Sequence, residues 1–140
     1  MMTPERLQTL LARVCKYRVA PTGECFTAVN PTEQFPHKIA IVFPIFEDGA
    51  KLQIQSFAPT CEIPPNRLCE AIALCNAWNE SGSVGVGYVA CERNVFAYKA
   101  ATSFMSVDSS DDYLVENFFK PTLFALQQFY KEVAGQFCRA

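Results

Sequence analysis

The sequence contains a single histidine, His37, and this scarcity removes most familiar catalytic and metal-binding arrangements. Zinc sites are usually built from histidines and clustered cysteines, and no pair among the seven cysteines has Cys-x-x-Cys spacing. A catalytic Cys–His pair would have to combine His37 with Cys25, Cys61 or Cys91, and nothing in the sequence brings one of them close. We therefore expect no enzymatic activity, no metal site and no cofactor.

Long hydrophobic runs are also missing. The longest one, residues 39–46, is far too short to span a bilayer, and no apolar segment follows a basic start at the N-terminus. We expect a cytoplasmic protein without a membrane partner, whose thiols stay reduced. Cys15, Cys69 and Cys75 fall within helical apolar patterns and are expected to fill the core as small apolar residues.

An excess of positive charge is the third absence. Twelve lysines and arginines stand against 14 acidic residues, and the net charge is −2. Without a basic stripe, nucleic acid is a poor partner. The clustered carboxylates, Glu47-Asp48 and Asp111-Asp112, sit where a turn and a helix start are expected, and these positions explain them without catalysis.

Aromatic and aliphatic residues are abundant: half of the 140 residues are apolar, with 12 Phe, 5 Tyr and one Trp. This content supports one domain, residues 1–140, with a core of its own. Periodicity and turn residues predict helices and strands in the order α-β-β-β-α-β-β-α, which is an α+β fold with an antiparallel sheet. The expected ranges are helix 3–17, strands 24–29, 38–46 and 51–57, helix 64–79, strands 83–91 and 95–103, and a last helix from about 108.

Two of these elements carry detailed expectations. The helix over 64–79 should bury one side, formed by Leu68, Ala71, Ile72, Cys75 and Trp78. The last helix should begin with a capping box, Ser109-x-x-Asp112, and kink at Pro121. Two adjacent apolar rows run along this helix: Phe119, Leu123, Leu126, Tyr130, Val133 and Phe137, and beside them Val115, Phe118, Thr122, Ala125 and Phe129. Together they form an apolar arc wider than one packing contact needs, which leaves room for a subunit or client contact.

Gly85 and Gly87 lie two residues apart in the strand over 83–91, so they share a face that another element can approach closely. Together with Gly82 they also suggest a phosphate-binding loop. Such a loop needs a strand before it and a helix after it, whereas here the helix comes first. Close packing is therefore the favoured interpretation.

The segment Leu74-Cys75-Asn76-Ala77-Trp78-Asn79, followed by a hairpin and a long aromatic helix, resembles the YbjN family over about residues 20–137. The resemblance implies a fold similar to type III secretion chaperones, usually dimeric, and roles in regulation without an established reaction. It supplies no catalytic residues. Asn76, Trp78 and Asn79 fill the family element and are expected to be structural, while Cys75 replaces a more usual aliphatic residue.

Three functional hypotheses follow. The first is a non-enzymatic, dimeric, YbjN-like protein that binds another polypeptide. The second is a dedicated secretion chaperone that keeps one effector partly unfolded. The third, motivated only by the seven cysteines, is a thiol-dependent enzyme or redox sensor.

Overall fold

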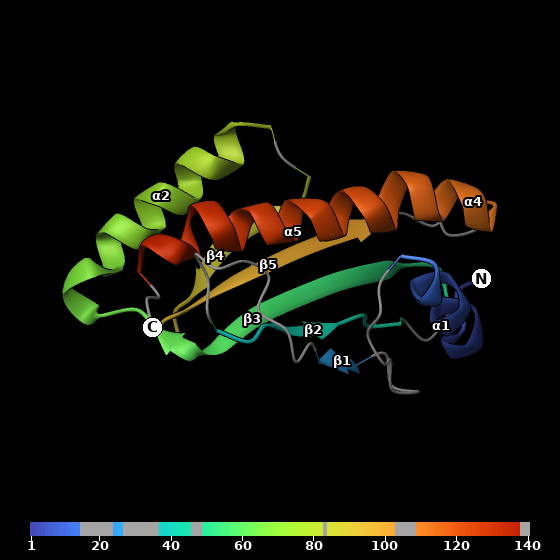
Figure 1. The fold of residues 1–140 in the computed structure, drawn as a ribbon, viewed down its shortest axis with the longest axis horizontal. Coiled ribbons are helices and arrows are strands. Elements are labelled where there is room, and N and C mark those ends of the chain that lie inside the picture. The colour runs from blue at the N-terminus through green and yellow to red at the C-terminus, as the bar shows by residue number, and fades with distance from the viewer. Residues whose placement is uncertain (15–23, 27–36, 46–48, 83, 103–108, 138–140) are drawn as a thin grey trace.

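The computed structural model describes residues 1–14, 24–26, 37–45, 49–82, 84–102 and 109–137. Five antiparallel strands form one sheet in the order β1-β2-β3-β5-β4, with helices along one face, which confirms the α+β class (Figure 1). The strands are β1 (Glu24–Phe26), β2 (Ala40–Val42), β3 (Leu52–Glu62), β4 (Val86–Ala90) and β5 (Val95–Thr102). The main helices are α1 (Pro4–Ala12), α2 (Leu68–Glu80), α4 (Asp111–Leu114) and α5 (Lys120–Glu132).

Helix α1 begins as the sequence predicts. The Thr3 hydroxyl accepts a hydrogen bond from the Arg6 amide at 3.2 Å, and Pro4 occupies the first turn. Leu7, Leu10 and Leu11 are fully buried along one stripe. Residues 15–17, which were expected to continue the helix, lie outside the described residues.

The strand expected over 38–46 is shorter than predicted. Strand β2 keeps only three residues, and the middle of the sheet is β3, which pairs with β2 on one side and β5 on the other. Pro44 lacks an amide donor, so the regular ladder stops before it. The hairpin to β3 is present, with Gly49 at φ +65°, although Glu47 and Asp48 lie outside the described residues.

Strand β3 continues beyond its predicted end. Its burial alternates as expected from Leu52 to Ala58, with Gln53, Gln55 and Phe57 on the more open face. The register against β5 shifts between Phe57 and Glu62. This irregularity lets the strand pass Pro59 and continue, which the short alternating pattern could not predict.

Helix α2 buries a narrower side than expected, after a 3-10 turn over Pro65–Arg67. Ala71, Cys75 and Trp78 are buried, but Ile72 is 39% exposed and Cys69 is exposed, so both expectations were wrong. Successive residues turn by about 100° around a helix. Ile72 therefore lies at one edge of the helix side that faces β4. The helix is rotated so that this edge is exposed and the opposite edge is buried.

The C-terminal helix begins one residue later than predicted: Ser110, and not Ser109, caps α4 by accepting the Tyr113 amide at 3.2 Å. Pro121 was expected to kink this helix. A π-helical turn over Val115–Phe119 joins α4 to α5 immediately before it. A proline ring crowds the carbonyl four residues earlier, here that of Asn117, and the wider π turn leaves room for it.

Both apolar rows of this helix are used inside the molecule, because α5 lies along the sheet (Figure 1). Phe129 is at the centre of an aromatic cluster with Trp78, Phe96 and Tyr98, at centroid distances of 5.1 to 6.2 Å. Gly87 makes this cluster possible, since a Cβ there would lie 2.1 Å from the Phe129 ring. The predicted close approach is confirmed at Gly87, but the predicted glycine face shared with Gly85 is wrong, because β4 begins at Val86 and Gly85 lies outside it at φ +74°.

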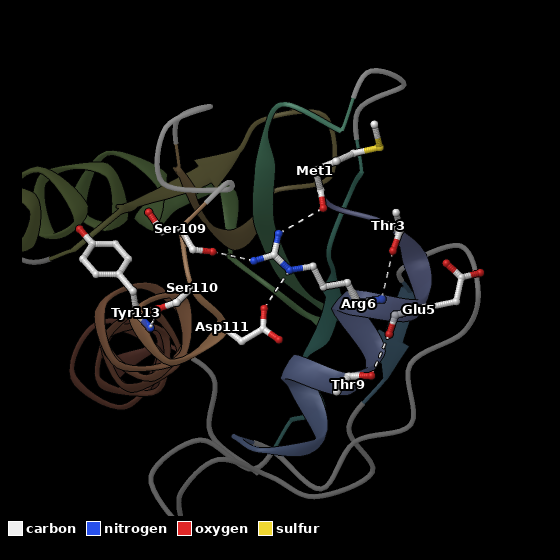
Figure 2. Close-up of polar contacts among 9 residues, drawn as sticks. All are labelled: Met1, Thr3, Glu5, Arg6, Thr9, Ser109, Ser110, Asp111 and Tyr113. Atoms are coloured by element: carbon white, nitrogen blue, oxygen red, sulfur yellow. Dashed lines mark hydrogen bonds and ion pairs between the residues drawn. The ribbon is translucent and has the colours of Figure 1, made fainter.

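Arg6 joins the N-terminal segment to the start of the C-terminal helix (Figure 2). Its guanidinium donates to the Asp111 carboxylate at 2.9 Å, to the Ser109 carbonyl at 2.8 Å and to the Met1 carbonyl at 3.1 Å. A second ion pair, Arg13 to Asp112 at 2.7 Å, lies nearby and is more exposed. Together these contacts fix α1 against the start of α4.

Candidate functional site: an apolar surface around Val84

Four large apolar side chains are exposed near the start of β4. Val84 and Val86 are each 44% exposed, Tyr113 on α4 is 48% exposed, and Phe124 on α5 is 65% exposed. We call these four residues the Val84 surface. They border two hollows, of about 430 and 450 Å³, and Val84 lines both.

The first hollow lies between the end of β5 and the start of the C-terminal helix. Ala100, Ala101 and Thr102 of β5 line one side. Opposite them are residues of α4 and the π turn: Tyr113, Leu114, Asn117 and Phe118. Lys99 is the charged residue among the described residues that line this hollow, and its ammonium group lies 5.6 Å from the centroid of the Tyr88 ring.

The second hollow lies between the end of α2 and the outer side of α5. Trp78, Ser81 and Gly82 come from the α2 end. The α5 side is formed by Pro121, Phe124, Ala125, Gln128 and Glu132. Gly82, at φ +85°, follows the end of α2 in the left-handed conformation that glycine adopts readily.

A turn at Gly85 separates the hollows and exposes Val84. Gly85 has φ +74°, a conformation that favours glycine, and a Cβ there would lie 2.4 Å from the Tyr98 hydroxyl oxygen. That hydroxyl donates a hydrogen bond to the Val84 carbonyl at 2.5 Å. Burial raises the pKa of Tyr98, so it remains a donor at neutral pH. Tyr98 therefore holds the segment that presents Val84.

The three residues of the family element have different places. Trp78 is 8% exposed, packs edge-on against Phe129, and also borders the second hollow. The Asn79 side chain pairs with the backbone of Gly87 on β4: its amide donates to the carbonyl at 2.9 Å, and its oxygen accepts from the N–H at 3.0 Å. Asn76 is exposed and lines neither hollow.

The candidate thiols are dispersed over the described part of the chain. Cys69, Cys75 and Cys91 are free, and burial raises the pKa of the Cys75 thiol to about 11. Cys61 is disulfide-bonded, so the expectation of fully reduced thiols was wrong for it. Cys15 and the side chain of Cys25 lie outside the described residues.

His37 Nδ1 lies 3.1 Å from the Thr60 hydroxyl oxygen. Within the described ranges, no three His, Cys, Asp or Glu residues form a group that would hold a metal ion. No helix in that part of the chain is long and apolar enough to cross a membrane.

Sequence reasoning missed the Val84 surface. The two apolar rows of the last helix, which suggested a contact site, are buried in the core. The sequence did contain a signal for this surface, because Tyr113 and Phe124 are large aromatic residues that belong to neither apolar row. Large apolar residues off the core-facing stripe of a helix are candidates for contact with another molecule.

No family model and no curated protein matches the chain. Among solved structures it is similar to a chain in the HopA1–SchA chaperone–effector complex, with 11% identity, a TM-score of 0.48 and coverage of 91% of each chain. It is also similar to an uncharacterised protein from Methanothermobacter thermautotrophicus, with 16% identity, a TM-score of 0.49 and coverage of 97% and 99%. Both TM-scores lie under 0.5, so neither similarity assigns a family, partner or function to this chain.

Proposed function

We propose that this protein is a non-enzymatic module that binds another polypeptide through the Val84 surface. The observation that carries the proposal is the grouping of four large apolar side chains, each 44 to 65% exposed, around two adjoining hollows. Scattered apolar residues are normal on a protein surface, whereas a group of them marks a contact site.

A polypeptide suits this surface better than a compact small molecule does. The two hollows extend in different directions from Val84, one toward β5 and α4 and the other toward α2 and α5. A single compact ligand would fill one of them and leave the rest of the Val84 surface in water. A chain with spaced apolar side chains can cover both, and about 25 cal/mol is gained per Å² of apolar area removed from water.

The test is selection from a random peptide display library, followed by fluorescence anisotropy with the selected peptides. We expect apolar peptides to be enriched and their affinity to be lost in the Val84→Asp variant. The matched control is Ile72→Asp, because Ile72 is exposed on α2 and lines neither hollow. Failure to select any peptide, or equal weakening by both variants, would refute the proposal.

The expected homodimer is part of the proposal, and it competes for the same surface. Light scattering at tens of micromolar measures the mass of the wild type and of Val84→Asp. If the dimer persists in the variant, the Val84 surface is not the dimer interface and is available to another polypeptide. A dimer that dissociates in the variant would show that the surface joins two copies of this chain, and would overturn binding of a different partner there.

A further inference from the structure

The end of β5 has an open edge inside the first hollow. The ladder between β4 and β5 ends where Val86 pairs with Lys99. Ala100, Ala101 and Thr102 continue to pair with β3, at Ile54, Gln53 and Leu52. On their other side no described strand pairs with them, because the chain turns away at Gly85.

The alternation of an antiparallel ladder shows which backbone groups are open. Gly87 directs both its N–H and its carbonyl to Asn79, away from β5. Its partner Tyr98 must then direct its backbone N–H and carbonyl toward β3. These backbone groups point to alternate sides of β5 at successive residues, so those of Lys99 point toward β4 and those of Ala100 toward β3. Ala101 therefore directs its N–H and carbonyl into the hollow, where no described strand pairs with them.

The side chains around this edge determine which partner segment can bind beside Ala101. Leu114 and Phe118 face the hollow from the helix side and are apolar. On the opposite face of β5, Ala101 and Lys99 are exposed, and Lys99 makes no ion pair with any described residue. In a strand, neighbouring side chains point to opposite faces. A strand beside Ala101 would then place apolar residues toward Phe118 and the residue between them toward Lys99.

We propose that β5 accepts a partner segment as an added strand at Ala101, and that the segment alternates apolar, acidic and apolar residues. Its backbone pairs with Ala101, its two apolar side chains enter the hollow beside Leu114 and Phe118, and its carboxylate lies within reach of Lys99. Strand addition satisfies the open backbone groups, while alternate side chains provide selectivity. This inference rests on the proposed function and names the partner class and its binding mode.

The probe is a capped peptide, Thr-Val-Glu-Val-Thr, titrated into isotope-labelled full chain and followed by NMR. We expect nuclear Overhauser contacts between Ala101 and the peptide backbone, and amide exchange at Ala101 slowed by about tenfold. N-methylation of the peptide at the bonded amide should abolish binding, because it removes the donor to the Ala101 carbonyl. Binding without protection of Ala101 would overturn strand addition while leaving polypeptide binding intact.

Charge reversal provides a second measurement. The variant Lys99→Glu should bind the Glu peptide about threefold more weakly and prefer Thr-Val-Lys-Val-Thr, since exposed pairs contribute modestly. The matched control is Lys131→Glu, because Lys131 is an exposed lysine on α5 that lines neither hollow and, like Lys99, makes no ion pair with any described residue. An unchanged preference in Lys99→Glu, or the same change in the control, would refute the role of Lys99. If neither peptide binds while library selection still yields ligands, only this inference fails.

Discussion

Thr122 is a fully buried threonine whose hydroxyl has no hydrogen-bond partner among the described residues. A buried unpaired hydroxyl destabilises the folded state by about 1 to 3 kcal/mol. We predict that Thr122→Val raises the free energy of unfolding by about 1 kcal/mol, measured by urea denaturation.

The matched control is Ser56→Ala. The Ser56 hydroxyl lies 3.0 Å from that of Tyr130 in the core, so removing it leaves Tyr130 without this partner and should lower stability. A Thr122→Val variant that is less stable than the wild type would show that the hydroxyl has a role in the folded protein.

The described thiols should differ sharply in reactivity. Cys69 and Cys91 are exposed, whereas burial raises the pKa of Cys75 from 9.0 to about 11. At pH 8 we expect an electrophilic probe, mapped by mass spectrometry, to label Cys69 and Cys91 quickly and Cys75 only after unfolding. Rapid labelling of Cys75 in the native protein would revive the hypothesis of a reactive thiol.

The same shift predicts a pH dependence of stability. Between about pH 9 and 11 the folded protein retains the Cys75 proton while the unfolded chain releases it. The unfolded chain binds fewer protons in this window, so Cys75 makes stability fall as pH rises through it. The Cys75→Ala variant removes that contribution and should show a shallower fall in urea midpoint.

At the scale of elements, Asn79 connects α2 to the edge of the sheet. Its amide occupies the N–H and the carbonyl of Gly87 that a neighbouring strand would otherwise use. We predict that Asn79→Ala speeds amide exchange at Gly87 and lowers stability by about 1 to 2 kcal/mol.

Asn76→Ala is the control for this prediction, because Asn76 is exposed on the same helix, and its effect should stay within about 0.5 kcal/mol. Equal effects of the two substitutions would mean that the pairing with Gly87 contributes nothing measurable.

The sequence predicts the kinds of element better than their limits. Apolar spacing locates α1, α2 and the last helix because burial follows that spacing. It does not predict the register shift in β3 or the π turn before Pro121, which depend on how each element meets its neighbours. Ile72 shows the same limit, since its exposure depends on the rotation of α2 against β4.

At the scale of the whole molecule, the candidate site could not be assembled from the sequence. Val84, Tyr113 and Phe124 come from three separate segments, and only the tertiary fold brings them around the two hollows. The open edge of β5 depends in turn on where β4 begins, which the turn at Gly85 sets. Apolar periodicity predicts which residues form the core, and the residues of the Val84 surface are not part of that core.

Arg6 carries a prediction at this same scale. Its side chain is only 22% exposed and bonds Ser109, Asp111 and Met1. We expect Arg6→Ala to lower the unfolding free energy by about 1 kcal/mol. The control is Arg13→Ala, whose pair with Asp112 is 44 and 84% exposed and should contribute less than about 0.5 kcal/mol. Equal losses would contradict a special role for Arg6.

The bond from Arg6 to Asp111 spans 105 positions of the sequence. During translation the ribosome must therefore add about 100 further residues, a delay on the order of 5 to 20 s, before the first helix meets its partner. Until then α1 lacks the ion pairs that join it to α4, and we expect α1 of the nascent chain to be open to proteases. A stalled chain that ends before Asp111 but already resists cleavage within α1 would contradict this order of assembly.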